Sequence, residues 1–425
     1  MDHLEEKRLS LQKRIYADHP AAKADRAYPG FHLASPSHFL FDYWGAYIRD
    51  GYYHIFYDVC VSPEDNEHTI YGHARSRDLL TWETLPIALT PDAAKGELHC
   101  FSGGCCKDEN GRPHFFYTSI GPEEAGRGAG HGAQQWFAEP ADDDLTRLSQ
   151  TDEGALMDDI HGGMHVRDWR DPCVIRYQGQ YLMILGGCVE EHGCILLYTS
   201  DDMRHWTYRH ILAWSEHADG KPWECPNIIC ADGKVGLIYS PCAEVHVKTG
   251  TLDDDLRFQE EQDEVLDPAA WNGFYAPQVF TDEAGRVLLI AWMPECDNVP
   301  HKGWSGVMSL PRILHITADG VHSEPVPGAE TLPGVTRQTV ARVALACTWT
   351  LLDNGEERTL LTLAADGTLT LDRGQSTLAK GPDVHSITRT VPVYDMNDVF
   401  IAVDGSAVEV LVNGKSLSGR IYPTK

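Results

Sequence analysis

The sequence predicts an all-β protein in which a five-bladed β-propeller is followed by a β-sandwich. Three observations support this: turn glycines at blade-like intervals, acidic turns that recur behind them, and a change of pattern near the C-terminus. The turn glycines are each followed by a short apolar run, and they are separated by 60, 68, 54 and 52 residues. This is the period of a four-stranded blade with its loops. The five glycines are Gly51, Gly111, Gly179, Gly233 and Gly285.

The acidic turns support the same division into blades. They are followed by an aromatic or apolar residue, trail the first four hairpins, and lie at residues 76–82, 142–145, 200–206 and 253–258. Short aromatic and β-branched runs with hardly any helical periodicity, typical of strands, fill the chain from Phe31 to about Arg312. We expect the propeller to occupy residues 31–316, after an N-terminal segment of residues 1–30.

The pattern changes in the last quarter of the chain. Residues 317–334 contain three prolines, which indicates a linker. From residue 335 to 425 the apolar residues alternate more regularly, and tight turns such as Asp353-Asn354-Gly355 join the runs. This segment predicts the β-sandwich.

Composition limits the partners. The chain has 425 residues, 42% of them apolar, which is enough for one large core and a second, smaller one. A net charge of -28 and a pI near 5.0 argue against a nucleic acid or an anionic membrane as partner and favour a neutral substrate. The charged first twenty residues lack the apolar region of a secretory signal, and no apolar run is long enough to span a bilayer. The twelve cysteines are scattered. We expect a cytoplasmic protein without disulfides, metal or cofactor.

Three carboxylates stand at equivalent places in three blades. Asp42 lies nine residues before Gly51, Asp171 eight before Gly179, and Glu224 nine before Gly233. Each is therefore expected to open the first strand of a hairpin, the strand that lines the channel of a propeller. A single carboxylate near a turn is commonly solvated or capping, but three in equivalent positions indicate a shared site.

Carboxylates around an aromatic pocket, without a Ser-His-Asp pattern, a metal cluster or a phosphate loop, favour cleavage of a glycosidic bond. Glu224, between Trp223 and Cys225, has the more apolar neighbours and is the candidate acid for the leaving oxygen. We assign Asp171 to charge stabilisation. Alternation along a strand predicts that Arg170 points the opposite way and holds another group of the site or sugar hydroxyls.

Taken in order, several motifs resemble glycoside hydrolase family 32, which comprises invertases, sucrose-phosphate hydrolases, levanases and inulinases. They include Trp169-Arg170-Asp171-Pro172, Trp223-Glu224-Cys225-Pro226, Phe274-Tyr275-Ala276-Pro277-Gln278 and Ile290-Ala291-Trp292-Met293. The resemblance runs from about Phe31 to the C-terminus. It implies a propeller followed by a sandwich, and a retaining double displacement on a β-fructofuranosyl group.

The same resemblance implies roles for single residues. Asp42 matches the nucleophile, Asp171 the transition-state stabiliser and Glu224 the acid/base, while Arg170 matches the arginine beside the stabiliser. Candidate substrate-binding residues are Phe101 and Ser102, which match the motif that lines the fructosyl subsite, together with Tyr275 and Trp292.

The nucleophile motif departs from the family. Where the family usually has Trp-Met-Asn-Asp-Pro-Asn-Gly, residues 39–45 read Phe-Leu-Phe-Asp-Tyr-Trp-Gly, so that Phe41 and Trp44 replace two asparagines. Asp58 stands in place of a sugar-binding glutamine. We expect Phe41, Trp44 and Asp58 to line a more apolar subsite that favours a substrate other than plain sucrose. Asp58 either bonds a sugar hydroxyl or adds a fourth carboxylate that raises a neighbour's pKa.

Two other functions stay open beside a β-fructofuranosidase or fructosyltransferase acting on a small fructoside. One is an inverting furanosidase of the arabinanase type, distinguished by a wider separation of its carboxylates. The other is a carbohydrate-binding propeller without turnover. For the glycine-rich stretch 121–135 we expect a flexible loop at the pocket mouth, because His131 and the later His161 and His165 lack the pattern of metal ligands.

Overall fold

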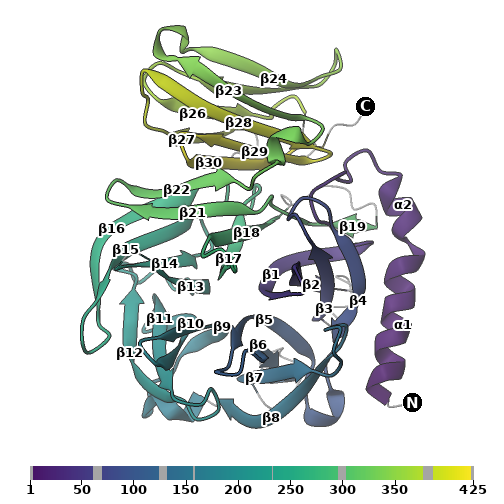
Figure 1. The fold of residues 1–425 in the computed structure, drawn as a ribbon, viewed down its shortest axis with the longest axis vertical. Coiled ribbons are helices and arrows are strands. Elements are labelled where there is room, and N and C mark those ends of the chain that lie inside the picture. Colours follow the sequence, from purple (N-terminus) through teal and green to yellow (C-terminus); the bar gives the residue numbers. More distant parts are fainter. Residues whose placement is uncertain are drawn as a thin grey trace.

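The computed structural model describes residues 3–60, 69–123, 132–156, 158–231, 233–294, 303–376 and 386–422. Five antiparallel sheets surround a central channel, and two further sheets stack above the fifth of them (Figure 1). The predicted propeller followed by a sandwich is confirmed. None of the helices within the described residues is both long and apolar enough to cross a membrane.

The five blades follow one another along the chain. The first contains β1 (His38–Arg49), β2 (Tyr52–Cys60), β3 (Thr69–Ser76) and β4 (Glu83–Leu89). The second contains β5 (His99–Lys107), β6 (Pro113–Ile120), β7 (Ala133–Pro140) and β8 (Leu148–Leu156). The third contains β9 (Arg167–Tyr177), β10 (Gln180–Val189), β11 (His192–Ser200) and β12 (Thr207–Trp214). The fourth contains β13 (Glu224–Ala231), β14 (Lys234–Ser240), β15 (Val245–Leu252) and β16 (Phe258–Asp267). The fifth contains β17 (Tyr275–Thr281), β18 (Val287–Met293), β20 (Val307–Met308), β21 (Arg312–Thr317) and β22 (Gly320–Pro325).

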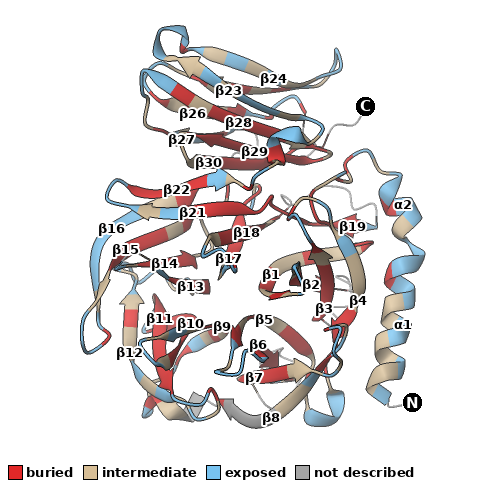
Figure 2. Cartoon of the chain, in the orientation of Figure 1, coloured by how far each residue is buried: buried red, intermediate tan, exposed pale blue. Residues whose placement is uncertain are grey.

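The first strands of the blades form the inner wall of the propeller. β1, β5, β9, β13 and β17 contact one another in a closed ring. The short strand β19 (Trp304–Ser305) pairs in parallel with the start of β1, so a segment from the fifth blade is joined to the first. Residues of the inner strands are largely buried (Figure 2). Side chains carried by these strands therefore converge on the channel.

The segment between the domains differs from the prediction. Residues 317–334 were expected to be a linker, but Gly320–Pro325 forms β22, which pairs with β21 as the outer strand of the fifth blade. Proline is tolerated there because Pro325 ends an edge strand. The prolines thus follow a strand rather than replace it, and the connection to the sandwich begins after Pro325.

The sandwich consists of two four-stranded sheets. One contains β23 (Val335–Ala341), β28 (Met396–Asp404), β29 (Ala407–Val412) and β30 (Lys415–Arg420); the other contains β24 (Cys347–Asp353), β25 (Arg358–Leu363), β26 (Thr368–Asp372) and β27 (Ser386–Thr390). One apolar core runs from the fourth and fifth blades into both sheets. The two domains therefore share buried surface.

The N-terminal segment forms helices α1 (His3–Ala17) and α2 (His19–Lys23), which lie along the outer side of the first blade (Figure 1). The described part also has short 3₁₀ turns at Ala93–Lys95, Asp158–His161, Ala329–Thr331 and Arg342–Ala344. Arg8 and Tyr16 donate hydrogen bonds to backbone carbonyls of the β4 strand. Tertiary contacts thus fix α1.

Candidate active site

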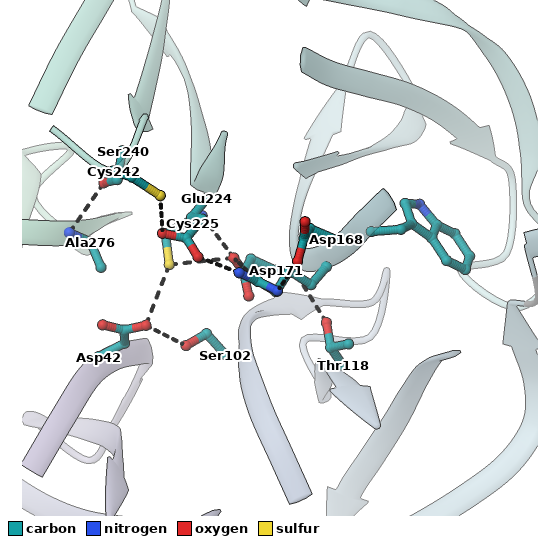
Figure 3. Close-up of polar contacts among 12 residues, drawn as sticks. Asp42, Ser102, Thr118, Asp168, Asp171, Glu224, Cys225, Ser240, Cys242 and Ala276 are labelled. Atoms are coloured by element: carbon teal, nitrogen blue, oxygen red, sulfur yellow. Dashed lines mark hydrogen bonds and ion pairs between the residues drawn. The ribbon is translucent and has the colours of Figure 1, made fainter. Parts of the chain in front are cut away.

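The three predicted carboxylates meet in one cavity. Asp42 comes from β1, Asp171 from β9 and Glu224 from β13, and Figure 3 shows them facing one another across the channel. The cavity has a volume of about 270 Å³ and is lined by Phe41, Asp42, Asp58, Cys60, Thr69, Phe101, Ser102, Arg170, Asp171 and Glu224. A site on strands of three different blades is held rigidly, because apolar clusters pack between neighbouring blades.

The inner strands are distorted at the level of the site. Asp171, Cys225 and Ala276 have φ values of 63°, 46° and 45°, in the left-handed region that L-residues rarely adopt. The distortion breaks the alternation of side chains, so Arg170 does not point away from Asp171. The guanidinium Nε lies 3.9 Å from Asp171 Oδ2, and the prediction of opposite directions was wrong.

Asp42 accepts hydrogen bonds from two neutral donors. Its Oδ2 is 3.3 Å from the Ser102 hydroxyl and 3.7 Å from the Cys225 thiol, both of which donate to it (Figure 3). Burial, with the nearby charges of Asp171 and Glu224, raises the pKa of Asp42 to about 7. The carboxylate is therefore poised to change its charge near neutral pH.

Asp171 is held on both sides. Its backbone N–H donates to Thr118 Oγ1 at 2.9 Å, and its Oδ2 accepts from the Cys225 N–H at 2.8 Å and from the thiol at 3.5 Å. Burial raises its pKa to about 6, although Arg170 opposes the shift. These contacts orient Asp171, and the nearby Arg170 favours its ionised form, which suits stabilisation of positive charge.

Glu224 has polar neighbours. Its Oε1 pairs with the Arg170 guanidinium, which also contacts Asp168 at 3.1 Å, and its Oε2 accepts from the Tyr275 hydroxyl at 2.5 Å. The adjacent Trp223 instead stacks on Tyr239 in the blade core, with ring centroids 3.8 Å apart. The expectation of an apolar setting for Glu224 was wrong, because Trp223 faces away from it and Arg170 and Tyr275 contact the carboxylate.

Asp58 is a fourth carboxylate. It is buried, its Oδ2 lies 3.1 Å from Ser102 Oγ, and its Oδ1 has no hydrogen-bond partner among the described residues. Burial and then Asp42 raise the pKa of Asp58 well above its usual range. Because Ser102 has one hydroxyl hydrogen, the bridge is complete when protonated Asp58 donates to Ser102 and Ser102 donates to Asp42.

The aromatic candidates divide into two groups. Phe41 and Phe101 line the cavity, and Trp292 packs against Phe41 with ring centroids 5.4 Å apart. Trp44 does not reach the site. It is fully buried between Tyr71 and other aromatic rings of the first two blades, because the register of β1 shifts between Tyr43 and Gly45. Its prediction as a substrate contact is corrected.

The sequence did not identify Cys225, Thr118 and Cys242 as members of the site. The Cys225 thiol touches both aspartates, and Cys242 Sγ lies 3.5 Å from Glu224 Oε2. In the sequence, only their position beside or opposite a candidate catalytic carboxylate could have indicated that they belong to the site. Residues 124–131 of the loop predicted at 121–135 lie outside the described residues, and within the described ranges no group of three His, Cys, Asp or Glu side chains is placed to hold a metal ion.

Comparison with known proteins agrees with this geometry. The model of the "Glycosyl hydrolases family 32 N-terminal domain" matches residues 32–325. The sucrose-6-phosphate hydrolase and the raffinose invertase of Escherichia coli are each 28% identical to this chain; each match covers 98% of the chain and 94% of the relative.

Solved structures share the fold. The sucrose-6-phosphate hydrolase from Lactobacillus gasseri has a TM-score of 0.81 at 22% identity, covering 97% of this chain and 91% of that one. A Bombyx mori β-fructofuranosidase in complex with sucrose has a TM-score of 0.79 at 21% identity, covering 99% and 94%.

Proposed function

We propose that this chain, which belongs to glycosyl hydrolases family 32, cleaves a β-fructofuranosyl group from a small fructoside with retention of configuration. The observation that carries the proposal is the convergence of Asp42, Asp171 and Glu224 in one cavity of the propeller. These acids fall inside the matched family segment and supply the groups that a double displacement needs.

The first step joins the sugar to the protein. The ionised Asp42 attacks the anomeric carbon of the fructosyl group while Glu224 gives its proton to the leaving oxygen. The glycosidic bond breaks, an ester to Asp42 forms, and the aglycone leaves as an alcohol. Asp171 stabilises the positive charge that develops on the sugar in the transition state.

The second step releases the sugar. Glu224 takes a proton from water, and the resulting hydroxide attacks the anomeric carbon and frees Asp42. Tyr275 and Arg170 each hold one oxygen of Glu224, so the carboxyl keeps its orientation through both steps. An acceptor alcohol in place of water would give transfer instead of hydrolysis.

The cavity supports an unphosphorylated substrate. Arg170 is the basic residue among its described lining residues, and it is already engaged by Glu224 and Asp168. We infer that the fructosyl ring packs against Phe41 and Phe101 and that Asp58 and Ser102 meet its hydroxyls. A phosphate group in the subsite would add charge to an already acidic cluster.

Leaving-group dependence tests the role of Glu224. Glu224→Gln should slow hydrolysis of sucrose by about 1,000-fold, because the proton for the leaving oxygen is lost. Hydrolysis of p-nitrophenyl β-fructofuranoside, whose leaving group needs no proton, should fall far less. Equal losses on both substrates, measured as kcat/KM, would remove Glu224 from the acid role.

Product stereochemistry tests the double displacement. In the presence of methanol, the wild-type protein should form methyl β-fructofuranoside, identified by NMR. Formation of the α-anomer would favour the inverting furanosidase mechanism. Neither that mechanism nor a non-catalytic propeller is favoured by the family match. The cytoplasmic location expected from the sequence remains a prediction.

A further inference from the structure

We propose that Trp271 is the platform on which the aglycone sugar of the fructoside stacks, and that the β-sandwich holds this platform in place. The residue lies in the loop between β16 and β17, outside every motif of the sequence. The inference rests on the proposed function, since an aglycone is present only if the protein cleaves a fructoside.

Trp271 is connected directly to the candidate acid. Its ring stacks on Tyr275, with centroids 4.3 Å apart and an interplanar angle of 26°, and the Tyr275 hydroxyl donates to Glu224 at 2.5 Å. Glu224 protonates the oxygen that carries the aglycone, so the aglycone must lie on the Glu224 side of the cavity. Trp271 extends the aromatic surface on that side.

A large face of this tryptophan remains open. Trp271 is 44% exposed, whereas Tyr275 beneath it is buried. Trp292 meets its ring edge-on at 5.8 Å and packs against Phe41 of the cavity at 5.4 Å. A continuous run of aromatic rings thus leads from the cavity to the surface, the arrangement that carbohydrate and other small-molecule sites use.

The loop is fixed by the other domain. Two successive backbone hydrogen bonds, from Gly273 N and Phe274 N to the Ala270 carbonyl, close it into a tight turn. The Asn272 carbonyl accepts from the Arg420 N–H of β30 at 3.0 Å, and its side-chain Oδ1 accepts from Arg373 at 3.2 Å.

The backbone of the loop also touches the sandwich. A Cβ added to Gly273 would lie 2.6 Å from the Gly419 Cα. The backbones of the loop and of β30 are therefore in close contact at this point. A platform ordered in advance costs little entropy on binding.

The shape of this surface identifies the occupant. A flat indole face exposed beside a carboxyl fits the C–H face of a neutral pyranose ring, as in a glucosyl aglycone. A stacking contact of this size contributes about 0.5–1.5 kcal/mol beyond its burial, which corresponds to about a tenfold change in affinity at most. We expect Trp271 to select for fructosides with a sugar on the leaving side.

Paired substrates test the proposal. Trp271→Ala should raise KM for sucrose about tenfold and change KM for methyl β-fructofuranoside, whose aglycone is one carbon, by less than twofold. Trp271→Phe should recover most of the sucrose affinity. The matched control is Trp214→Ala, which removes a 53% exposed tryptophan at the end of β12. It should leave KM for both substrates unchanged.

Two outcomes would overturn the proposal. Equal losses on sucrose and methyl fructoside would mean that Trp271 only supports Tyr275 and Glu224, and unchanged kinetics on both would mean that it contacts no aglycone. Circular dichroism melting of each variant checks folding, and Trp271→Phe supplies the comparison if the alanine variant melts early. If wild-type protein cleaves neither substrate, the proposed function itself fails.

Discussion

Two clusters of carboxylates, one in the channel and one at the junction of propeller and sandwich, have opposite electrostatic surroundings. At the junction of propeller and sandwich, Glu409 accepts hydrogen bonds from His32, from the Leu310 N–H and from Arg312. Burial alone would raise its pKa, but Arg312 and His32 outweigh burial and lower it to about 2. In the channel, no cation of the described part of the chain forms an ion pair with Asp42, and its pKa rises to about 7.

The difference separates a structural cluster from a reactive one. The carboxylate of Asp404 accepts three backbone N–H groups at residues 30–32 and a ring nitrogen of His32, so its charge is fully satisfied. Asp42 and Asp58 share one serine hydroxyl instead. Incomplete compensation costs stability and leaves a carboxyl available to react, which is why strongly shifted groups gather at active sites.

The largest effect is expected from the centre of the channel cluster. Asp42→Asn should lower kcat on sucrose by about 10,000-fold or more, because the amide cannot form the ester intermediate. The same change removes a buried, poorly compensated charge, so the Tm should stay equal or rise. A large loss of Tm would place Asp42 in the structural class with Glu409.

The equivalent substitution at the junction should lower stability and leave activity unchanged. Glu409→Gln removes the nearer counter-charge of the buried Arg312, which keeps Asp267 at 3.8 Å, and should lower the free energy of unfolding by about 3 kcal/mol, measured in urea. Activity per folded molecule should not change. The control is Asp398→Asn, which breaks an exposed pair with Arg337 and should cost less than about 1 kcal/mol. Similar costs for both variants would contradict the comparison.

The sequence predicted the repeating parts of this architecture well. Spaced turn glycines and acidic turns give the blades, and three equivalent carboxylates give the site, because a period carries information in sequence. Local distortions carry no such signal. The register shift in β1 that buries Trp44 and the left-handed Asp171 that turns Arg170 toward Glu224 both arise from packing between blades. Helix α1 was missed because its few apolar residues become meaningful only against the first blade.

The pH dependence of stability distinguishes the clusters further. The folded pKa of Asp42 lies above its unfolded value near 3.8, so ionisation destabilises the fold as pH rises from about 4 to about 7. Ionisation of Glu409 has the opposite effect and stabilises the fold. This stabilisation is lost as pH falls from about 4.5 toward 2. The free energy of unfolding of wild type should therefore fall between pH 4 and 7, and Asp42→Asn should reduce this fall by about 2 kcal/mol. The effect is smaller than the full pKa shift implies, because Asp42 keeps some contact with water.

Urea unfolding of wild type and Asp42→Asn across this range measures the difference. Glu409→Gln serves as the control, because its free energy of unfolding should still fall between pH 5 and 7 as it does in wild type. Parallel curves for wild type and Asp42→Asn would show that Asp42 ionises normally in the folded protein.

The smallest effect concerns Asp58. In Asp58→Asn the amide can still donate to Ser102, as the protonated acid does, so kcat/KM near pH 7 should change by less than about fivefold. Asp58→Leu removes the donor and lets Ser102 turn away from Asp42. This should lower kcat/KM about tenfold. The folded pKa of Asp58 is raised, so its ionisation also opposes folding as pH rises, and Asp58→Asn should melt at a higher temperature than wild type at pH 8. If leucine were tolerated as well as asparagine, the serine bridge would have no part in preparing Asp42 for attack, and Asp58 would be only a wall of the cavity.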